Sequence, residues 1–506
     1  MAAFWSKIVA FFSSIFMALS ALFGLGGNTP GPSPEPEPVI PTPEQGVWLL
    51  TDIPAYGAGT YSTALYNTGT GLDYEFAPTE DTGEIQEDPD ESETDPTEEP
   101  AEQYTHKDSF MQIVSGTTQS DFTAYCGKLE QNGYTRTFSN QLENNYYAGY
   151  AKEGSSVYLI HDGNQNVTRV IDDCVNTVSL DQFSYSYDGI TSTAAETAAP
   201  GVYQFSYPYY DSKHNMRELF ASNGMLYVIQ LPDNRLVVID GGSSYQASNQ
   251  NIAEFIRFIR KLTGKTKNDV IDIAMWYGTH SHADHINFFY KTVRKFHTQL
   301  NVQRAMFNYQ SQTTLPYTKK ATKLKKSLKT WYPDLLYVKG RSGYQFTLGD
   351  ADFQILYTQE ECIRPLDASC PFTNANDASA VLKVTLGGKS FLFLGDAYLI
   401  VQTNLLKNFT AATLHADVLQ AAHHMYNDLT KLYPVVAPTY VMCPQSRLKT
   451  EETGLTSYQT LRRVVPEENF FFAGDNIVYG FLPQPYGNME ITQTPVACGA
   501  YDNSSL

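Results

Sequence analysis

A short run of histidine and aspartate residues, Thr279–His285 with the sequence THSHADH, directly follows an apolar segment that ends at Tyr277. Residues two apart in an extended chain point the same way, so His280 and His282 can converge on one ion. If the chain then turns into a helix, Asp284 and His285 can face a second ion beside the first. Imidazole and carboxylate ligands suit zinc, iron or manganese. The run therefore predicts a metal centre at the end of a strand.

The apolar periodicity around this run predicts a layered α/β domain over residues 201–506. Two helices are expected, at 251–262 and 288–296. The expected strands have short apolar or alternating patterns and cover 225–230, 235–239, 270–277, 345–348, 352–356, 380–386 and 390–394.

Three further motifs occur in a fixed order around the histidine run. Asp240-Gly241-Gly242 ends the expected strand 235–239, Gly395-Asp396 follow the strand 390–394, and Asp417–His424 reads DVLQAAHH. With the full H-x-H-x-D-H motif, this order resembles the metallo-β-lactamase-fold hydrolases, over roughly Met225 to Tyr479. The resemblance implies an αββα sandwich that carries two divalent metal ions, zinc or manganese.

The resemblance also implies roles for individual residues. Asp396 would bridge the two ions, and Asp240 would support the metal site from behind its ligands. His423 would be the last ligand, with His424 beside it to orient substrate or donate a proton; the reverse assignment of these two histidines stays open. Asp284 would help to orient the attacking hydroxide. The implied metal ligands are His280, His282, Asp284, His285, Asp396 and His423.

Two departures from the family pattern stand out. Many members carry another histidine ligand before the bridging aspartate, whereas this chain has Asn376-Asp377-Ala378-Ser379 there. That pattern is similar to the hydrolase domain of ComEC-like competence proteins and their stand-alone relatives, in which Asn376 and Ser379 would replace the missing histidine. The first ion would then be weakly bound or absent. In addition, Ile286–Phe288 stand where the family usually has a glycine.

A two-metal centre is expected to hydrolyse its substrate with activated water. The ComEC-like resemblance implies a phosphodiesterase or nuclease, acting on nucleic acid or an envelope polymer. The same centre could instead cleave a small ester, lactone, thioester or β-lactam, or hold a structural metal in a non-catalytic surface binding protein. The chain contains no dinucleotide-binding or P-loop motif, and nothing in it points to a protein partner.

The net charge of −19 at first argues against an anionic substrate. However, residues 1–200 hold 6 basic and 29 acidic side chains, whereas residues 201–506 hold 29 and 25. The expected catalytic half is therefore slightly basic and permits a phosphodiester. Six lysines between Lys319 and Lys329 either follow a phosphate backbone or form a solvated helix face.

The first 200 residues predict export and a separate small module. Lys7 precedes an apolar stretch, Ile8–Leu25, which indicates a signal peptide or signal anchor over residues 1–27, and a Pro-rich linker covers 28–45. The protein is then expected outside the cell or at its surface, held to the membrane if the segment is uncleaved. Residues 46–200 predict a small α+β module with an acidic disordered loop at 79–103.

Cys362 and Cys370 are close enough in sequence to form a disulfide, and a pair of free thiols is the alternative.

Overall fold

The computed structural model describes residues 46–70, 108–173, 180–186, 200–205, 207–211, 213–216, 224–309, 318–426 and 429–496. The predicted leader, Pro-rich linker and acidic loop lie outside these residues. Within the described part of the chain, no helix has the length and apolarity needed to cross a bilayer. Gln45–Leu506 forms one compact unit.

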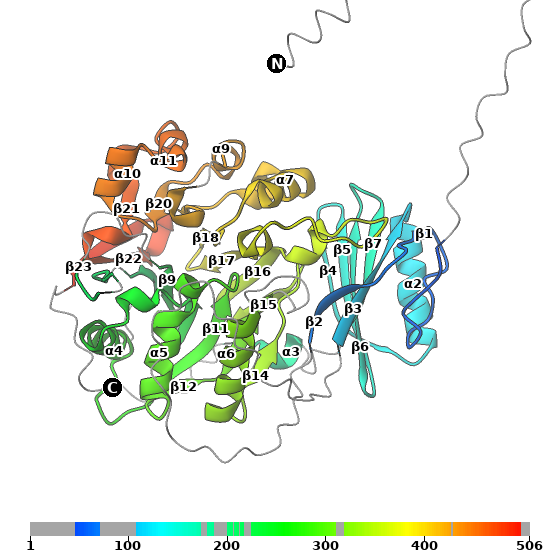
Figure 1. Ribbon diagram of the computed structural model, residues 1–506, viewed down its shortest axis with the longest axis horizontal. Helices are drawn as coiled ribbons and strands as arrows, with labels where there is room; N and C mark the ends of the chain where they lie inside the picture. The colour runs from blue at the N-terminus through cyan, green and yellow to red at the C-terminus, as the bar shows by residue number, and fades with distance from the viewer. Residues whose placement is uncertain are drawn as a thin grey trace, which may run out of the picture. The chain divides into compact units, whose positions relative to one another are not determined.

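The described strands of this unit form three sheets (Figure 1). The first sheet has the order β1-β3-β7-β6-β5-β4, with β2 paired to β3. Its pairings are antiparallel, and α2 packs against β4 and β5. The elements of this part are β1 Thr60–Tyr61, β2 Tyr66–Thr70, β3 Asp108–Ser115, α2 Gln119–Gln131, β4 Thr135–Leu142, β5 Asn145–Lys152, β6 Ser155–Asp162, β7 Val167–Asp172 and α3 Leu180–Phe183.

The second sheet has nine strands in the order β14-β13-β11-β10-β9-β8-β22-β23, with β12 also paired to β11. The pairs β10–β11, β11–β13 and β13–β14 are parallel. Its elements are β8 Gly201–Gln204, β9 Leu226–Gln230, β10 Leu236–Asp240, α4 Asn249–Thr263, β11 Ile271–Gly278, α5 Asn287–Phe296, β12 Leu300–Val302, β13 Arg304–Phe307, α6 Thr318–Trp331, β14 Leu336–Val338, β22 Ile477–Pro483 and β23 Met489–Pro495.

The third sheet has seven strands in chain order, β15-β16-β17-β18-β19-β20-β21. Its strands from β18 to β21 are parallel. Its elements are β15 Gln345–Leu348, β16 Ala351–Tyr357, β17 Val381–Leu386, β18 Lys389–Phe393, α7 Leu399–Asn408, α8 Ala411–Leu414, β19 Val418–Gln420, α9 Leu432–Val436, β20 Tyr440–Cys443, α10 Arg447–Thr453, α11 Thr456–Leu461 and β21 Phe470–Phe472.

The second and third sheets pack face to face, and their outer faces are covered by helices. Side chains from both inner faces share one core, in which the rings of Tyr227 and Phe393 lie 5.4 Å apart. A second apolar cluster joins the nine-stranded sheet to α4, α5 and α6, and a third joins the seven-stranded sheet to α7, α9 and α11. These layers agree with the αββα sandwich implied by the resemblance.

The strands and helices expected from periodicity in residues 201–506 are present within a few residues of their predicted ends. In α4, for example, Ile252, Phe255 and Ile259 form the buried face. The helix begins after Ser248, whose side chain accepts a hydrogen bond from the backbone N–H of Asn251, and it ends at Gly264 with a φ of 65°.

Cys362 and Cys370 are both free thiols, so the structure contains no disulfide between them.

Candidate metal centre

The metal-binding motifs meet because each follows the carboxyl end of a strand. In the nine-stranded sheet, β10 and β11 are parallel and end at Asp240 and Gly278, so Asp240 lies next to the histidine run. In the seven-stranded sheet, β18 and β19 are also parallel, which places Asp396 near His423 and His424. The packed sheets bring the two edges together.

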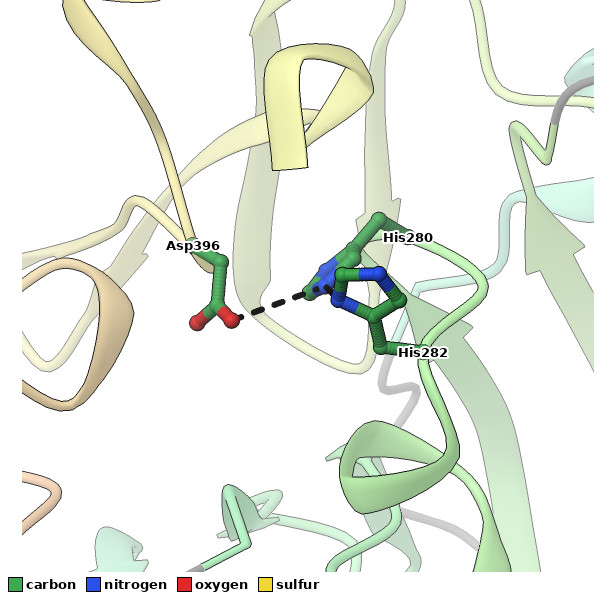
Figure 2. Close-up of side chains that lie close together, drawn as sticks. All are labelled: His280, His282 and Asp396. Carbon is green, nitrogen blue, oxygen red and sulfur yellow. Dashed lines mark hydrogen bonds and ion pairs between the residues drawn. The ribbon is translucent and has the colours of Figure 1, made fainter. Parts of the chain in front are cut away.

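The structure gathers the candidate ligands into two groups. Within each group, the ligand atoms lie within 4.8 Å of one another. His280, His282 and Asp396 form the first group (Figure 2), and Asp284, His285 and His424 form the second. Figure 2 shows the two histidines on the loop after β11, with the carboxylate of Asp396 facing them from the opposite sheet.

Asp396 links the two groups. One of its carboxylate oxygens, Oδ2, lies 3.6 Å from Nε2 of His280. The other, Oδ1, lies 3.2 Å from Nε2 of His285 in the second group. The backbone N–H of Asp396 donates a 3.1 Å hydrogen bond to Oγ of Ser379, so this predicted supporting residue holds Asp396 in place.

Asp240 orients the ligands from behind, at the place that the D-G-G motif indicates. Its Oδ2 lies 2.7 Å from Nδ1 of His285, which leaves Nε2 of that ring pointing towards Asp396. Its Oδ1 accepts hydrogen bonds from the backbone N–H of Thr279 at 2.8 Å and from the Thr279 hydroxyl at 2.9 Å. The same hydroxyl lies 3.1 Å from Nδ1 of His280.

His423 and His424 occupy different environments. His424 is 3% exposed, with Nε2 3.1 Å from Oδ2 of Asp284 and Nδ1 3.2 Å from the carbonyl oxygen of Pro444. His423 is 21% exposed and stands outside both ligand groups, with Nε2 3.9 Å from Oδ2 of Asp396. Its Nε2 also lies 3.2 Å from Nδ2 of Asn376. The geometry thus favours His424 as the ligand, the reverse of the expected roles.

Two residues that support the candidate metal centre, Thr279 and Gln420, were not predicted from the sequence. Thr279 immediately precedes the histidine run and connects Asp240 to His280, as described above. Gln420, the last residue of β19, accepts hydrogen bonds from the backbone N–H groups of Leu394 and Gly395 at 2.8 and 2.7 Å. Its Nε2 donates to the carbonyl oxygens of Gly395 and Ala421. The sequence feature that could have indicated a role for Gln420 is its position as a polar residue inside the apolar stretch of the DVLQAAHH motif.

The buried imidazoles and carboxylates of the centre shift each other's pKa. Burial lowers the pKa of His285, but Asp396 and Asp240 outweigh it. Burial also lowers the pKa of His424, but Asp396 and Asp284 outweigh it, so both pKa values are raised. Burial lowers the pKa of His280, and the adjacent His285 ring lowers it further, which keeps His280 in the neutral form that binds metals. Burial raises the pKa of Asp396, but the nearby His285 and His424 rings outweigh it and hold this pKa well below its usual range. The carboxylate therefore stays ionised inside the protein, where it needs positive charge beside it.

Several buried atoms of the centre make no hydrogen bond of good geometry within the described residues: Nε2 of His285, Nε2 of His424, Oδ1 of Asp396 and Nδ1 of His423. The polar neighbours of the first three are candidate ligand atoms, since Nε2 of His285 lies 3.2 Å from Oδ1 of Asp396 and Nε2 of His424 lies 3.1 Å from Oδ2 of Asp284. Buried polar atoms are normally paired, so each of these calls for a partner. Divalent metal ions would satisfy the first three, and the imidazole and carboxylate donors are those that zinc or manganese accepts. The residues present therefore fit a metal centre.

No family model matches the chain, and no curated protein matches it. Among solved structures, it is similar to the metallo-β-lactamase-fold protein YhfI from Bacillus subtilis, with 12% identity and a TM-score of 0.32 over 54% of this chain and 96% of that one. It is also similar to MEM-A1, a subclass B3 metallo-β-lactamase from a soil metagenome library, with 15% identity and a TM-score of 0.26 over 53% and 90%.

A further similar structure is CmlA, a diiron β-hydroxylase from Streptomyces venezuelae, with 11% identity and a TM-score of 0.31 over 55% of this chain and 53% of that one. The chain thus spans about half the length of CmlA. At these identities and TM-scores the similarity does not indicate a function. The functional proposal below rests on the geometry of the chain itself.

Proposed function

We propose that this chain is a metal-dependent hydrolase that cleaves phosphodiesters. The observation that supports the proposal is the meeting of two three-residue ligand groups at one buried carboxylate, Asp396. Two divalent ions in such a centre supply an activated water and polarise the phosphorus atom under attack. The positive balance of residues 201–506 and the ComEC-like motif pattern favour a phosphodiester over a neutral ester.

We assign His280, His282 and Asp396 to the first ion, and Asp284, His285 and His424 to the second, with Asp396 shared. Asp284 is also accessible to solvent, since 34% of its side chain is exposed. From that position its carboxylate can accept a hydrogen bond from the attacking water and orient it.

His423 has a different role in this proposal. Its ring is partly exposed and lies between the rings of Tyr398 and Tyr426, at centroid distances of 5.1 and 5.7 Å. Asn376 holds the ring at Nε2. His423 can therefore orient the substrate, while Nδ2 of Asn376 donates to its Nε2 and leaves the proton of the neutral ring on the buried Nδ1.

Metal content and substrate range test the proposal together. We expect the purified chain to contain about one to two zinc or manganese ions and to hydrolyse bis-p-nitrophenyl phosphate and DNA. His282→Ala and Asp284→Ala should abolish hydrolysis, whereas replacement of His415, an exposed histidine outside both ligand groups, by alanine should not. A protein that takes up no metal would contradict the proposal. Activity on nitrocefin or a lactone alone would retain the hydrolase and reject the phosphodiester.

We further propose that the protein acts outside the cell or at its surface. The apolar segment at residues 8–25 and the Pro-rich linker after it support this location. Fractionation of cells that express a C-terminally tagged chain would test it, because an exported chain is found in the medium or the membrane fraction.

A further inference from the structure

One loop of the third sheet contacts both the first sheet and the metal centre. It covers residues 358–380, between Tyr357 at the end of β16 and Val381 at the start of β17. It contains two short 3-10 turns, η3 Gln359–Cys362 and η4 Ala375–Ala378. A loop of this length holds one conformation only if contacts along it offset the conformational entropy that it loses. We call residues 358–380 the linking loop.

The first half of the linking loop is bound by the first sheet. The buried guanidinium of Arg169, on β7, donates hydrogen bonds to the backbone carbonyl oxygens of Glu360 and Glu361, at 2.9 and 2.7 Å. The backbone N–H of Thr63 donates a 2.9 Å hydrogen bond to the carbonyl oxygen of Leu366. Since all three acceptors belong to the backbone, the first sheet fixes the path of this half of the loop.

The second half of the linking loop contacts three parts of the metal centre. The residues that it contacts there are Thr279, Asp396 and His423. The backbone N–H of Ala380 donates to the carbonyl oxygen of the first at 3.0 Å, Oγ of Ser379 accepts from the backbone N–H of the second at 3.1 Å, and Nδ2 of Asn376 lies 3.2 Å from Nε2 of the third. The position of this half therefore decides how several groups of the centre are held.

The two halves are connected by Tyr357, whose side chain is fully buried. Its hydroxyl donates a 3.1 Å hydrogen bond to the carbonyl oxygen of Asp377 and lies 2.9 Å from Sγ of Cys362. Because the hydroxyl has a single proton, the thiol donates in the second bond. Cys362 directly follows Glu361, which the first sheet holds, and Asp377 directly follows Asn376, which reaches the centre. One side chain thus spans from the bound half of the loop to the half that supports the metal ligands.

We propose that the first sheet positions the metal centre through the linking loop, with Arg169, Cys362 and Tyr357 as positioning residues. The first sheet fixes the first half of the loop, and the Tyr357 hydroxyl passes this constraint to the second half. Asn376 and Ser379 then hold the side chains of the centre in place. The kinetic part of this inference rests on the proposed phosphodiesterase function, whereas the part on metal affinity rests only on the metal centre.

Tyr357→Phe tests the connection, because it removes the hydroxyl and keeps the buried ring. Zinc affinity of the metal-free full chain, measured by competition with a chromophoric chelator, should fall about 2- to 10-fold for the lost hydrogen bonds. At saturating zinc, the KM for bis-p-nitrophenyl phosphate should rise while kcat changes less than about two-fold, because the substrate-orienting side chain is held less firmly. Cys362→Ala should weaken zinc binding in the same direction, and Cys362→Ser, which keeps a donor, should restore most of it.

Tyr125→Phe is the matched control. Tyr125 is also buried, and its hydroxyl donates a 2.8 Å hydrogen bond to the carbonyl oxygen of Pro54 within the first-sheet part of the chain. This variant should lower the free energy of unfolding in urea and leave zinc affinity and KM unchanged. Equal losses of zinc affinity in Tyr125→Phe and Tyr357→Phe would overturn the proposal, as would a Tyr357→Phe chain with unchanged zinc affinity and KM.

Arg169→Lys tests the contribution of the first sheet. A lysine ammonium cannot reproduce the fork with which the guanidinium bonds two carbonyl oxygens, so zinc affinity should fall again. In Arg169→Lys/Tyr357→Phe the loss should be smaller than the product of the two single losses, because both residues act through the linking loop. Losses that multiply are typical of independent sites and would contradict the proposal. Absence of hydrolysis from every form would reject the phosphodiesterase and leave the zinc affinities as the test.

Discussion

The chemistry of single residues in the metal centre follows from how each side chain is held. Asp396 exposes both carboxylate oxygens to histidine rings because its backbone is anchored by Ser379. His285 directs Nε2 inward because its Nδ1 lies against Asp240. In both cases the residue behind the ligand decides which atom is available to a metal.

The two adjacent histidines provide a test at this scale. His424→Gln should lower the bound metal from about two ions to about one per chain, because the second group loses a ligand. His423→Gln should keep both ions and raise KM, because the ring lies outside both ligand groups and only orients the substrate. Elemental analysis and steady-state kinetics measure the two effects. The opposite pattern, with metal lost only from His423→Gln, would restore the assignment expected from the motif.

The sequence predicted which candidate residues lie close together better than it predicted how they are grouped. His280, His282 and His285 lie in one short segment directly after β11, so their spacing along the sequence already indicates that they lie close together. His423, His424 and Met425 have φ values of 47°, 48° and 66°, a run of left-handed residues that is uncommon and costs energy for side chains of this kind. The motif contains no glycine or asparagine that would indicate such a turn. Spacing therefore could not predict which of the two histidines joins a candidate ligand group.

At the scale of elements, the ends of β18 and β19 are joined by one side chain. Gln420 on β19 bonds the backbone of Leu394 and Gly395, next to the bridging Asp396. Gly395 itself has a φ of 55°, and an added Cβ would come within 2.8 Å of the Thr279 side chain. The two sheets thus approach so closely at the centre that only glycine fits there.

Replacing Gln420 with leucine tests this connection. Gln420→Leu leaves two buried N–H groups without an acceptor, which should cost about 1–3 kcal/mol of unfolding free energy for each group. Because one of those groups belongs to the residue before Asp396, the affinity for zinc should fall as well. Urea unfolding and zinc titration of the metal-free protein measure the two quantities.

Gln402 provides the matched control for this variant. It is a buried glutamine on α7 that accepts hydrogen bonds from the backbone N–H groups of Lys431 and Leu432 at 3.1 and 3.0 Å. Gln402→Leu should lower stability by a similar amount and leave zinc affinity unchanged. If both variants lowered zinc affinity equally, the effect of Gln420 would be general destabilisation.

At the scale of the whole unit, the first sheet is joined to the sandwich by buried charges. Arg169 of β7 donates hydrogen bonds to the backbone carbonyl oxygens of Glu360 and Glu361, at 2.9 and 2.7 Å. Arg341 forms ion pairs with Asp173, at 3.0 Å, and with Glu360, at 2.5 Å. These contacts could not be predicted from the sequence, because the paired residues are far apart along the chain. The hydrophobic pattern around each of them is that of an ordinary strand or loop.

Glu361 makes this junction sensitive to pH. Burial raises the pKa of Glu361 from 4.5 to about 8, and Ser342 and Arg169 offset this only in part. Since the folded pKa lies above the unfolded one, the folded state holds the proton more tightly. The stability that this provides is complete below pH 4.5 and is lost as the pH rises towards 8.

Comparison of the unchanged chain with Glu361→Gln between pH 5 and pH 7 isolates the contribution of Glu361 to the pH dependence of the unfolding free energy. The neighbouring Lys339 has its pKa lowered by burial to about 7, so it is protonated in both states across most of this window and adds little slope. A difference of one proton corresponds to about 1.4 kcal/mol per pH unit, so the unchanged chain should lose about 2–3 kcal/mol more than Glu361→Gln over this range. Urea unfolding in EDTA at each pH measures it, because metal binding then contributes no proton exchange. Parallel pH profiles for the two proteins would show that Glu361 is ionised in the folded state and that Arg169 compensates its burial.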